Sequence, residues 1–397
     1  MRKEGFRTVA AMVAAFMLIA APAEARIAIS PAQEQVAGEG QIRNAGVAYI
    51  EEYPPLQIIQ DTIIRWNPGR LAVFRDSSRR GLRPVHLLIT NESKVNAFSV
   101  AGGHIFVSDA MVKAFMVRNF NPNTGNVSGL EKPLGNGYEV YGHSALAAVL
   151  AHEYSHWERN YLQQETDLVT SFLDKAGEGV LSGKLERGDG RGFMRELEYA
   201  AALPKVYPFV VAFSQKEEAR ADSGAMELLD KTDVYSPGSL MTVAARLLDT
   251  EGMTDARHPG NAARKAAVAA HIKNLSGGRV VVDMDGRMRL DGKLFQGTGF
   301  MPSRNDVDSF DRTAYVAGQL AKCVREGVSQ VTFRNDEDSL QKSGGMPLMI
   351  ARGNGSTRFL VDKFDGSRKD EAARKEIESF LKKRGTSFLI KQQNRKE

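Results

Sequence analysis

Two histidines and a glutamate are spaced along one short stretch as two metal ligands and a base would be. Residues 152–156 read HEYSH. On a helix, residues four apart lie on the same face, so His152 and His156 can direct two imidazole nitrogens at one ion. Zinc accepts such nitrogen ligands in tetrahedral geometry. Glu153 lies beside the first histidine, where its carboxylate can take a proton from a water that zinc acidifies. The pattern predicts a hydrolytic zinc site rather than two unrelated histidines.

A catalytic zinc site needs a third protein ligand and an open fourth position. An acidic helical segment at 217–222, which reads EEARAD, offers candidates. Glu218 and Asp222 are four residues apart and share a helix face. Asp222 would then accept the free N–H of a ligating histidine and fix the orientation of its ring. Spacing alone does not separate Glu218 from Glu217, and it also fits a solvated acidic turn.

Three blocks of the sequence resemble the CAAX-prenyl-protease and HtpX-like zinc endopeptidases, most closely their soluble periplasmic, BepA-like branch. The first block spans 96–107 and contains NAF, GG and IFV. The second is AAVLAHEYSH at 147–156, and the third is EARAD at 218–222. The resemblance covers about residues 45–275 and no more.

The resemblance implies a fold, a metal and a ligand set. The expected fold class is α+β: a mainly helical gluzincin metallopeptidase domain with a small sheet, followed by a small α+β domain. One zinc ion per chain is expected, with Glu218 rather than Glu217 as the third ligand. The sequence departs from the family after His156, where WERN replaces the usual further histidine. That departure leaves the choice of substrate open.

The first block is expected to be a sheet edge beside the metal. An extended polypeptide substrate could pair with such a strand through backbone hydrogen bonds. The resemblance assigns substrate binding to Asn96, Ala97, Phe98, Gly102 and Gly103. The glycines also suit an ordinary tight turn, and the two interpretations are compatible because a backbone close to substrate favours glycine as well.

A weaker match to the family is an HP….R element formed by His258, Pro259 and Arg264. The resemblance implies that His258 and Arg264 take part in catalysis by hydrogen-bonding the oxyanion of the tetrahedral intermediate. Alternatively, His258 fills the open zinc position in a resting enzyme. A third interpretation is a helix start with Pro259 in its first turn.

The N-terminus is typical of a secretory signal peptide. Three basic residues among the first seven precede an apolar run at 9–21, and small residues follow at 23–25. The run is too short to span a bilayer comfortably. We therefore expect residues 1–25 to be removed and the protein to be exported to the periplasm, with an uncleaved anchor as the alternative. Cys323 is the only cysteine, so no internal disulfide is possible and we expect it to be buried.

Apolar spacing and turn residues divide the rest of the chain. We expect a loose segment at 26–45, the metallopeptidase domain at 46–275 and the second domain at 279–397. Helices are predicted over 46–80, 145–163, 163–200, 211–230, 260–274, 311–325 and 368–383. Strands are predicted over 85–90, 95–100, 105–107, 280–284, 287–290, 330–334, 347–351 and 357–362. A long surface loop is predicted over 119–142. The predicted helix caps are Ser144, Ser367 and Gly385.

The expected function is zinc-dependent metalloendopeptidase activity on exported or envelope proteins, in protein quality control. The alternative is a non-catalytic zinc-containing chaperone or scaffold of the envelope, against which an intact general base argues. Envelope proteins that contact residues 279–397 are possible partners. The net charge of +5 is interleaved with acidic residues, and the basic C-terminal end lacks aromatic residues, so no nucleic-acid binding is expected. Nothing in the sequence indicates an oligomeric state.

Overall fold

The structure, a computed structural model, describes residues 27–45, 53–68, 87–122, 124–135, 138–247, 260–304, 307–328, 330–334, 348–352, 358–363 and 367–393. Helices make up most of these residues, and the strands of this part form small sheets. The mainly helical α+β class predicted from the sequence is therefore confirmed. The predicted signal peptide and His258 lie outside the described residues.

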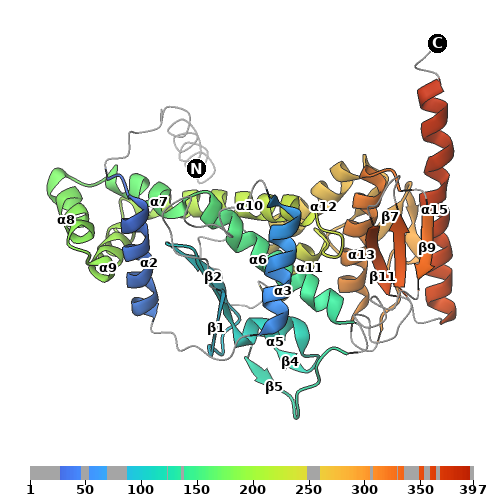
Figure 1. The fold of residues 1–397 in the computed structure, drawn as a ribbon, viewed down its shortest axis with the longest axis horizontal. Helices are drawn as coiled ribbons and strands as arrows, with labels where there is room; N and C mark the ends of the chain where they lie inside the picture. The colour runs from blue at the N-terminus through green and yellow to red at the C-terminus, as the bar shows by residue number, and fades with distance from the viewer. Residues whose placement is uncertain are drawn as a thin grey trace, which may run out of the picture.

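Three groups of elements follow one another along the long axis of the molecule (Figure 1). One end is a helical unit of α2 (Pro31–Ala45), α7 (Tyr161–Thr170), α8 (Lys175–Glu186) and α9 (Gly190–Ala201). The middle contains a small sheet and the helices α3 (Pro54–Trp66), α5 (Asp109–Met116), α6 (Glu139–Glu158), α10 (Tyr207–Leu229) and α11 (Ser239–Leu247). The other end contains two further sheets with α12 (Asn261–Leu275), α13 (Ser309–Arg325) and α15 (Arg368–Gln393).

The sheet in the middle has three strands in the order β1–β3–β2. Strand β3 (His104–Ser108) is parallel to β1 (Leu87–Thr90) and antiparallel to β2 (Ala97–Val100). Gly102 and Gly103 make the turn from β2 to β3, with φ values of 81° and 89° that glycine adopts easily because it has no Cβ. Strand β2 therefore lies at an edge of this sheet.

Helix α6 is buried on nearly all sides, because α3, α5, α10, α11 and strand β2 pack around it, and its own buried side chains are mostly apolar. It begins at Glu139, so the predicted cap at Ser144 is wrong. The Ser144 hydroxyl instead lies inside the helix, where it contacts the Ser239 hydroxyl at 2.7 Å. The helix ends at Glu158, and Asn160, with a left-handed φ of 55°, separates it from α7. The predicted continuous helix 145–163 is thus two helices.

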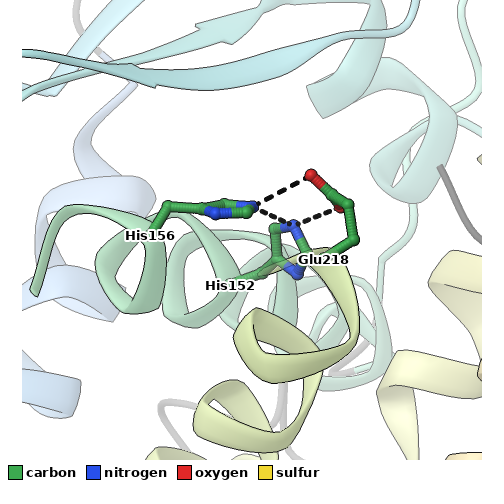
Figure 2. Close-up of side chains that lie close together, drawn as sticks. All are labelled: His152, His156 and Glu218. Carbon is green, nitrogen blue, oxygen red and sulfur yellow. Dashed lines mark hydrogen bonds and ion pairs between the residues drawn. The ribbon is translucent and has the colours of Figure 1, made fainter. Parts of the chain in front are cut away.

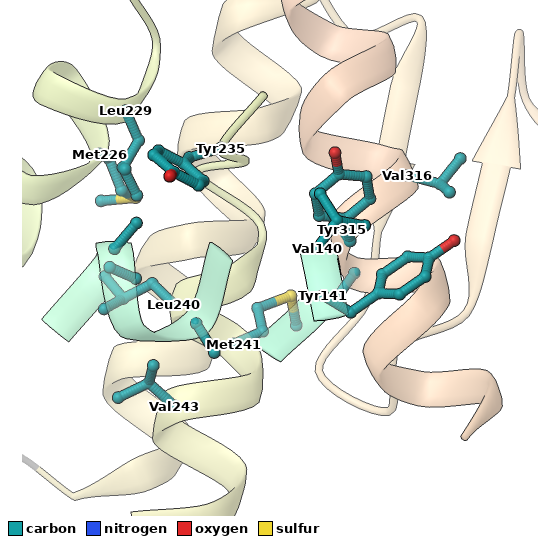
Figure 3. Close-up of a cluster of buried hydrophobic side chains, with 14 of the residues drawn as sticks. Val140, Tyr141, Met226, Leu229, Tyr235, Leu240, Met241, Val243, Tyr315 and Val316 are labelled. Carbon is teal, nitrogen blue, oxygen red and sulfur yellow. The ribbon is translucent and has the colours of Figure 1, made fainter. Parts of the chain in front are cut away.

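The apolar core crosses from the middle of the molecule into the C-terminal end. One cluster of buried side chains extends from Leu56 in α3 to Leu381 in α15. Figure 3 shows part of it, where Tyr141 of α6 lies against Tyr315 of α13 with ring centroids 5.0 Å apart. Cys323 is buried, as predicted. Residues after 279 therefore pack directly on the helix that carries the two candidate histidine ligands.

Besides α12, α13 and α15, the described C-terminal end contains two three-stranded sheets and a short 3₁₀ helix. The first sheet is β6 (Val280–Val282), β7 (Met288–Leu290) and β8 (Lys293–Leu294), followed by the 3₁₀ helix η2 (Phe295–Gly297). The second is β9 (Gln330–Arg334), β10 (Leu348–Arg352) and β11 (Arg358–Lys363), all antiparallel. Both sheets lie where strands were predicted. Ser367 caps α15 by accepting from the Asp370 amide, but the helix continues past Gly385, so the predicted end is wrong.

Two segments predicted to be irregular have regular structure. Residues 31–45, predicted to be loose, form α2, which packs closely on α9 and on the turn after β2. The predicted loop 119–142 contains the short strands β4 (Phe120–Asn121) and β5 (Asn126–Val127), and its last residues begin α6. No helix in the described part of the chain is long and apolar enough to cross a membrane.

Candidate metal centre

Helices α6 and α10 pack along each other and bring together the three side chains predicted to be ligands (Figure 2). The Nε2 atoms of His152 and His156 are 3.0 Å apart. Glu218 directs one carboxylate oxygen at each of them, at 3.2 Å from His152 and 3.1 Å from His156. One nitrogen from each ring and both oxygens of the carboxylate therefore face one small volume.

This arrangement fits a tetrahedral zinc ion. The donor atoms lie within 4.8 Å of one another, and two ligands of one zinc are about 3.3 Å apart when each is about 2.05 Å from the metal. Burial lowers the pKa of His152, but Glu218 and Asp222 outweigh burial and raise this pKa to about 10. The two carboxylates therefore stabilise a positive charge between these side chains, and a bound divalent cation would provide such a charge.

Asp222 lies behind the first histidine, one turn along α10 from Glu218. Its Oδ1 is 2.8 Å from Nδ1 of His152. A carboxylate can only accept, so Nδ1 carries a proton, and Nε2, which faces Glu218 and His156, is the nitrogen that a metal would bind. This contact sets the tautomer that a metal ligand requires.

Arg264 lies behind Asp222 rather than at the front of the site. Its Nε donates to Asp222 Oδ2 at 2.6 Å, and its Nη2 donates to Oδ1. Burial acts to raise the pKa of Asp222, but the Arg264 guanidinium and His152 outweigh it and hold this pKa below its usual value. The sequence predicted Arg264 to contact an oxyanion, whereas its buried guanidinium is committed to Asp222. His258, its predicted companion, lies outside the described residues.

Glu217 and Glu218 point to different places. Glu217 is 1% exposed and forms an ion pair with Arg220, one turn further along α10. Neighbouring residues on a helix are rotated by about 100°, so the two carboxylates cannot both face the histidines. The structure places Glu218, not Glu217, against the imidazoles.

Glu153 connects the metal-site helix to the edge strand. Its Oε2 accepts a hydrogen bond from the Ser99 backbone N–H at 2.8 Å. The Ser108 amide donates to the Asn96 carbonyl, and this fixes which residues of β2 pair with β3. The backbone N–H and C=O groups of residues 96, 98 and 100 point toward β3, and those of residues 97 and 99 point away from it. The Ser99 amide therefore lies on the free side of β2, and it holds the Glu153 carboxylate beside the three candidate ligands.

A groove of about 290 Å³ opens in front of the candidate ligands. One wall is β2 with the adjoining Ala101, and another is the α6–α7 corner, which contributes Trp157, Tyr161 and Leu162. The far end is lined by residues of α2 and α9, namely Glu34, Gln41 and Met194. Of the predicted substrate-binding residues, Ala97 and Phe98 line the groove. Asn96, Gly102 and Gly103 shape the strand and its turn instead.

Several lining residues could not be identified from spacing. Glu34 and Gln41 come from the segment predicted to be loose, and Met194 comes from a helix with no catalytic motif. Tyr161 lies edge-on to His156, with ring centroids 5.7 Å apart, and its hydroxyl is 3.2 Å from the Ser214 hydroxyl. No local pattern in the sequence marks these side chains, because the tertiary packing alone brings them to the site.

The described residues of the predicted loop 119–142 do not line the groove at the candidate metal centre. Leu134 of this segment, together with Val117 and Arg118 just before it, lines a separate cavity of about 350 Å³. That cavity lies where the first turns of α6 meet α11 and the start of α13, and none of the candidate ligands lines it.

Comparison with known proteins agrees with this geometry. The family model described as Peptidase family M48 matches residues 69–272, which contain both histidines, Glu218, Asp222 and Arg264. This range is just over half of the chain. No curated protein matches the sequence.

Proposed function

The chain belongs to peptidase family M48 and is a metallopeptidase, and we propose that it is a zinc-dependent endopeptidase acting on exported or envelope polypeptides. The observation that carries the proposal is the meeting of His152, His156 and Glu218 beside Glu153. A purely structural zinc site uses four protein ligands and is closed. Here three candidate ligands face an open groove, which favours a hydrolase over the scaffold alternative.

His152, His156 and Glu218 would hold the ion. When bound there, zinc supplies Lewis acidity to a carbonyl oxygen and lowers the pKa of an attacking water. Asp222 keeps Nδ1 of His152 protonated, so that Nε2 remains available to the metal. Arg264 fixes Asp222 in turn.

Glu153 performs the proton transfers in this proposal. Its carboxylate takes a proton from the water that attacks the scissile carbonyl, and then passes that proton to the leaving amine. The hydrogen bond from the Ser99 amide keeps the carboxylate at the groove rather than in solvent. Because Ser99 belongs to the edge strand, the same strand that aligns the substrate also orients the base.

The substrate is an extended polypeptide that lies along β2. The backbone groups of Ala97 and the Ser99 carbonyl face the groove, where they can pair with another strand. The basic and apolar N-terminal residues 1–25 support export. We therefore expect natural substrates among proteins that pass through or reside in the cell envelope.

The test combines metal analysis of the purified protein with cleavage of an unfolded protein such as reduced casein. We expect one zinc per chain, cleavage that a chelator abolishes, and restoration by added zinc. The Glu153→Gln variant should retain zinc and lose at least about a hundredfold in rate. Glu158→Gln, a carboxylate change near the end of the same helix, is the control. Cleavage by Glu153→Gln at the normal rate would refute the proposed mechanism.

A further inference from the structure

The two candidate histidine ligands are held in different ways. Nδ1 of His152 donates to Asp222, which Arg264 holds in turn. Within the described part of the chain, the polar contacts of His156 are made by Nε2 alone, with Nε2 of His152 and with Glu218. An imidazole whose second nitrogen has no partner can rotate about its side-chain bonds, which would move Nε2 away from the metal position. The orientation of the His156 ring therefore depends on packing.

Tyr161, the first residue of α7, packs on His156. The two rings meet at an interplanar angle of 84°, with centroids 5.7 Å apart. This edge-to-face arrangement is one that aromatic rings prefer. His156 also meets the ring of His152 at 83°, with centroids 4.6 Å apart, but that ring belongs to another candidate ligand. Among the described residues, Tyr161 is thus the aromatic partner of His156 outside the ligand set.

A break between α6 and α7 makes this contact possible. Tyr161 follows His156 by five residues, and on one continuous helix the two side chains would be rotated by about 140° from each other. Asn160 has a left-handed backbone, with φ of 55° and ψ of 52°, and it changes the direction of the chain after α6. Asparagine adopts this conformation more readily than most residues. The change of direction brings the Tyr161 ring against the last turn of α6, where His156 lies.

Two residues of α10 fix the Tyr161 ring. The ring contacts that of Phe213, with centroids 5.4 Å apart, and the Tyr161 hydroxyl is 3.2 Å from the buried Ser214 hydroxyl. Ser214 lies four residues before Glu218, on the same face of α10. The third candidate ligand and the support of Tyr161 therefore come from one face of one helix.

We infer that Tyr161 is a positioning residue for His156: its ring orients the imidazole, and Ser214 fixes the ring. The inference rests on the proposed function, because it concerns the metal centre of that site. It adds a second support beside Asp222, from another part of the fold. Asp222 is held by Arg264 of α12, whereas Tyr161 belongs to α7 of the helical unit at the other end of the molecule (Figure 1). Packing of this helical unit is thereby coupled to zinc affinity.

Zinc affinity of the full chain, measured by competition with a chromogenic chelator, tests this inference. Tyr161→Leu removes the ring but keeps an apolar side chain, and it should weaken zinc binding by about three- to tenfold. Tyr161→Phe keeps the ring and should stay within about twofold of the unaltered chain. An unchanged zinc affinity in Tyr161→Leu would overturn the inference. So would an equal loss in both variants, because the ring would then not be the orienting group.

A matched control separates positioning from a merely structural role. Phe172, just beyond the end of α7, packs on Phe209 of α10 with ring centroids 4.9 Å apart, and neither residue lines the groove. Phe172→Leu and Tyr161→Leu should both lower the denaturant midpoint of the metal-free chain. We expect zinc affinity to fall in Tyr161→Leu alone. Equal losses of affinity in the two leucine variants would mean that general packing against α10, and not Tyr161 itself, sets the metal site.

The affinity measurement does not depend on peptide cleavage, so this inference and the proposed function can fail separately. Tyr161 also lines the groove, and a change in cleavage rate alone would mix ligand positioning with substrate contact. If the unaltered chain binds zinc but cleaves no unfolded protein, the endopeptidase proposal fails and the role of Tyr161 is judged by the affinities. If cleavage requires zinc and Tyr161→Leu binds zinc normally, only the inference about Tyr161 fails.

Discussion

The guanidinium of Arg264 donates two hydrogen bonds to the carboxylate of Asp222, and both groups are buried. Asp222 in turn contacts Nδ1 of His152 at 2.8 Å. Three elements of the fold, α12, α10 and α6, are thereby connected in one chain of polar contacts that ends at a candidate metal ligand. The geometry of the metal centre thus depends on a residue that does not touch the groove.

Asp222→Asn should weaken metal binding without removing a ligand. The amide lacks the charge that pairs with Arg264 and stabilises the proton on Nδ1 of His152, so zinc affinity should fall by about 10- to 100-fold. Competition with a chromogenic chelator measures this. At saturating zinc, most of the activity should return, since Asp222 positions the ligand and does not itself react.

The matched control is Asp230→Asn, at the end of α10. Asp230 contacts His271 at 3.0 Å, away from the metal centre. Zinc affinity should be unchanged in that variant. Equal losses in both variants would indicate a general effect on α10 instead of a specific role of Asp222.

Glu218→Gln and Glu217→Gln should have opposite effects. Glu218 faces both imidazoles, so its amide variant should lose most of its zinc, as measured by elemental analysis. Glu217 is buried and pairs with Arg220, so its variant should keep zinc but unfold more easily, by about 1–3 kcal/mol. Zinc loss in Glu217→Gln with retention in Glu218→Gln would reverse the ligand assignment.

Ser99→Pro should lower kcat more than it raises KM. Proline removes the N–H that orients Glu153, and an edge strand tolerates proline where that N–H faces away from the sheet. A displaced base costs roughly a hundredfold in rate. Ala97→Pro removes the neighbouring outward N–H, which does not donate to Glu153, and it should mainly raise KM. Identical kinetic changes in the two variants would argue against an orienting role for the Ser99 amide.

His143 should make stability depend on pH below neutrality. Burial, with a smaller contribution from Lys363, lowers the pKa of this histidine from 6.5 to about 4, and its Nε2 is buried without a hydrogen-bond partner. Between pH 6.5 and 4 the unfolded chain therefore binds the proton and the folded chain does not. The contribution of His143 to stability is complete above pH 6.5 and declines as the pH falls toward 4.

Denaturant unfolding of the unaltered chain and of His143→Phe at several pH values measures this effect. The stability of the variant relative to the unaltered chain should increase as the pH is lowered from 6.5 to 4. Above pH 7 the difference should be constant. A difference that does not change across the whole range would mean that His143 titrates normally in the folded protein.

Some features followed from the sequence because they are local. His152, Glu153 and His156 take their relative positions from the helix itself, since the helical rotation alone puts residues four apart on one face. The hairpin of β6 and β7 likewise follows from the Asp285-Gly286 turn between two apolar runs, because Gly286 adopts a φ of 83°. In both cases backbone geometry over a few residues determines the outcome.

Other features were decided only by the tertiary structure. Asp222 meets His152 across 70 residues of sequence, and the Ser99 amide meets Glu153 across 54. Arg264 turned out to support Asp222, and α2, expected to be loose, closes the groove through the contact of Gly38 with Ala101. The physical reason is that such contacts depend on how whole helices and strands pack, and the spacing of residues within one element carries no information about which distant element will lie against it.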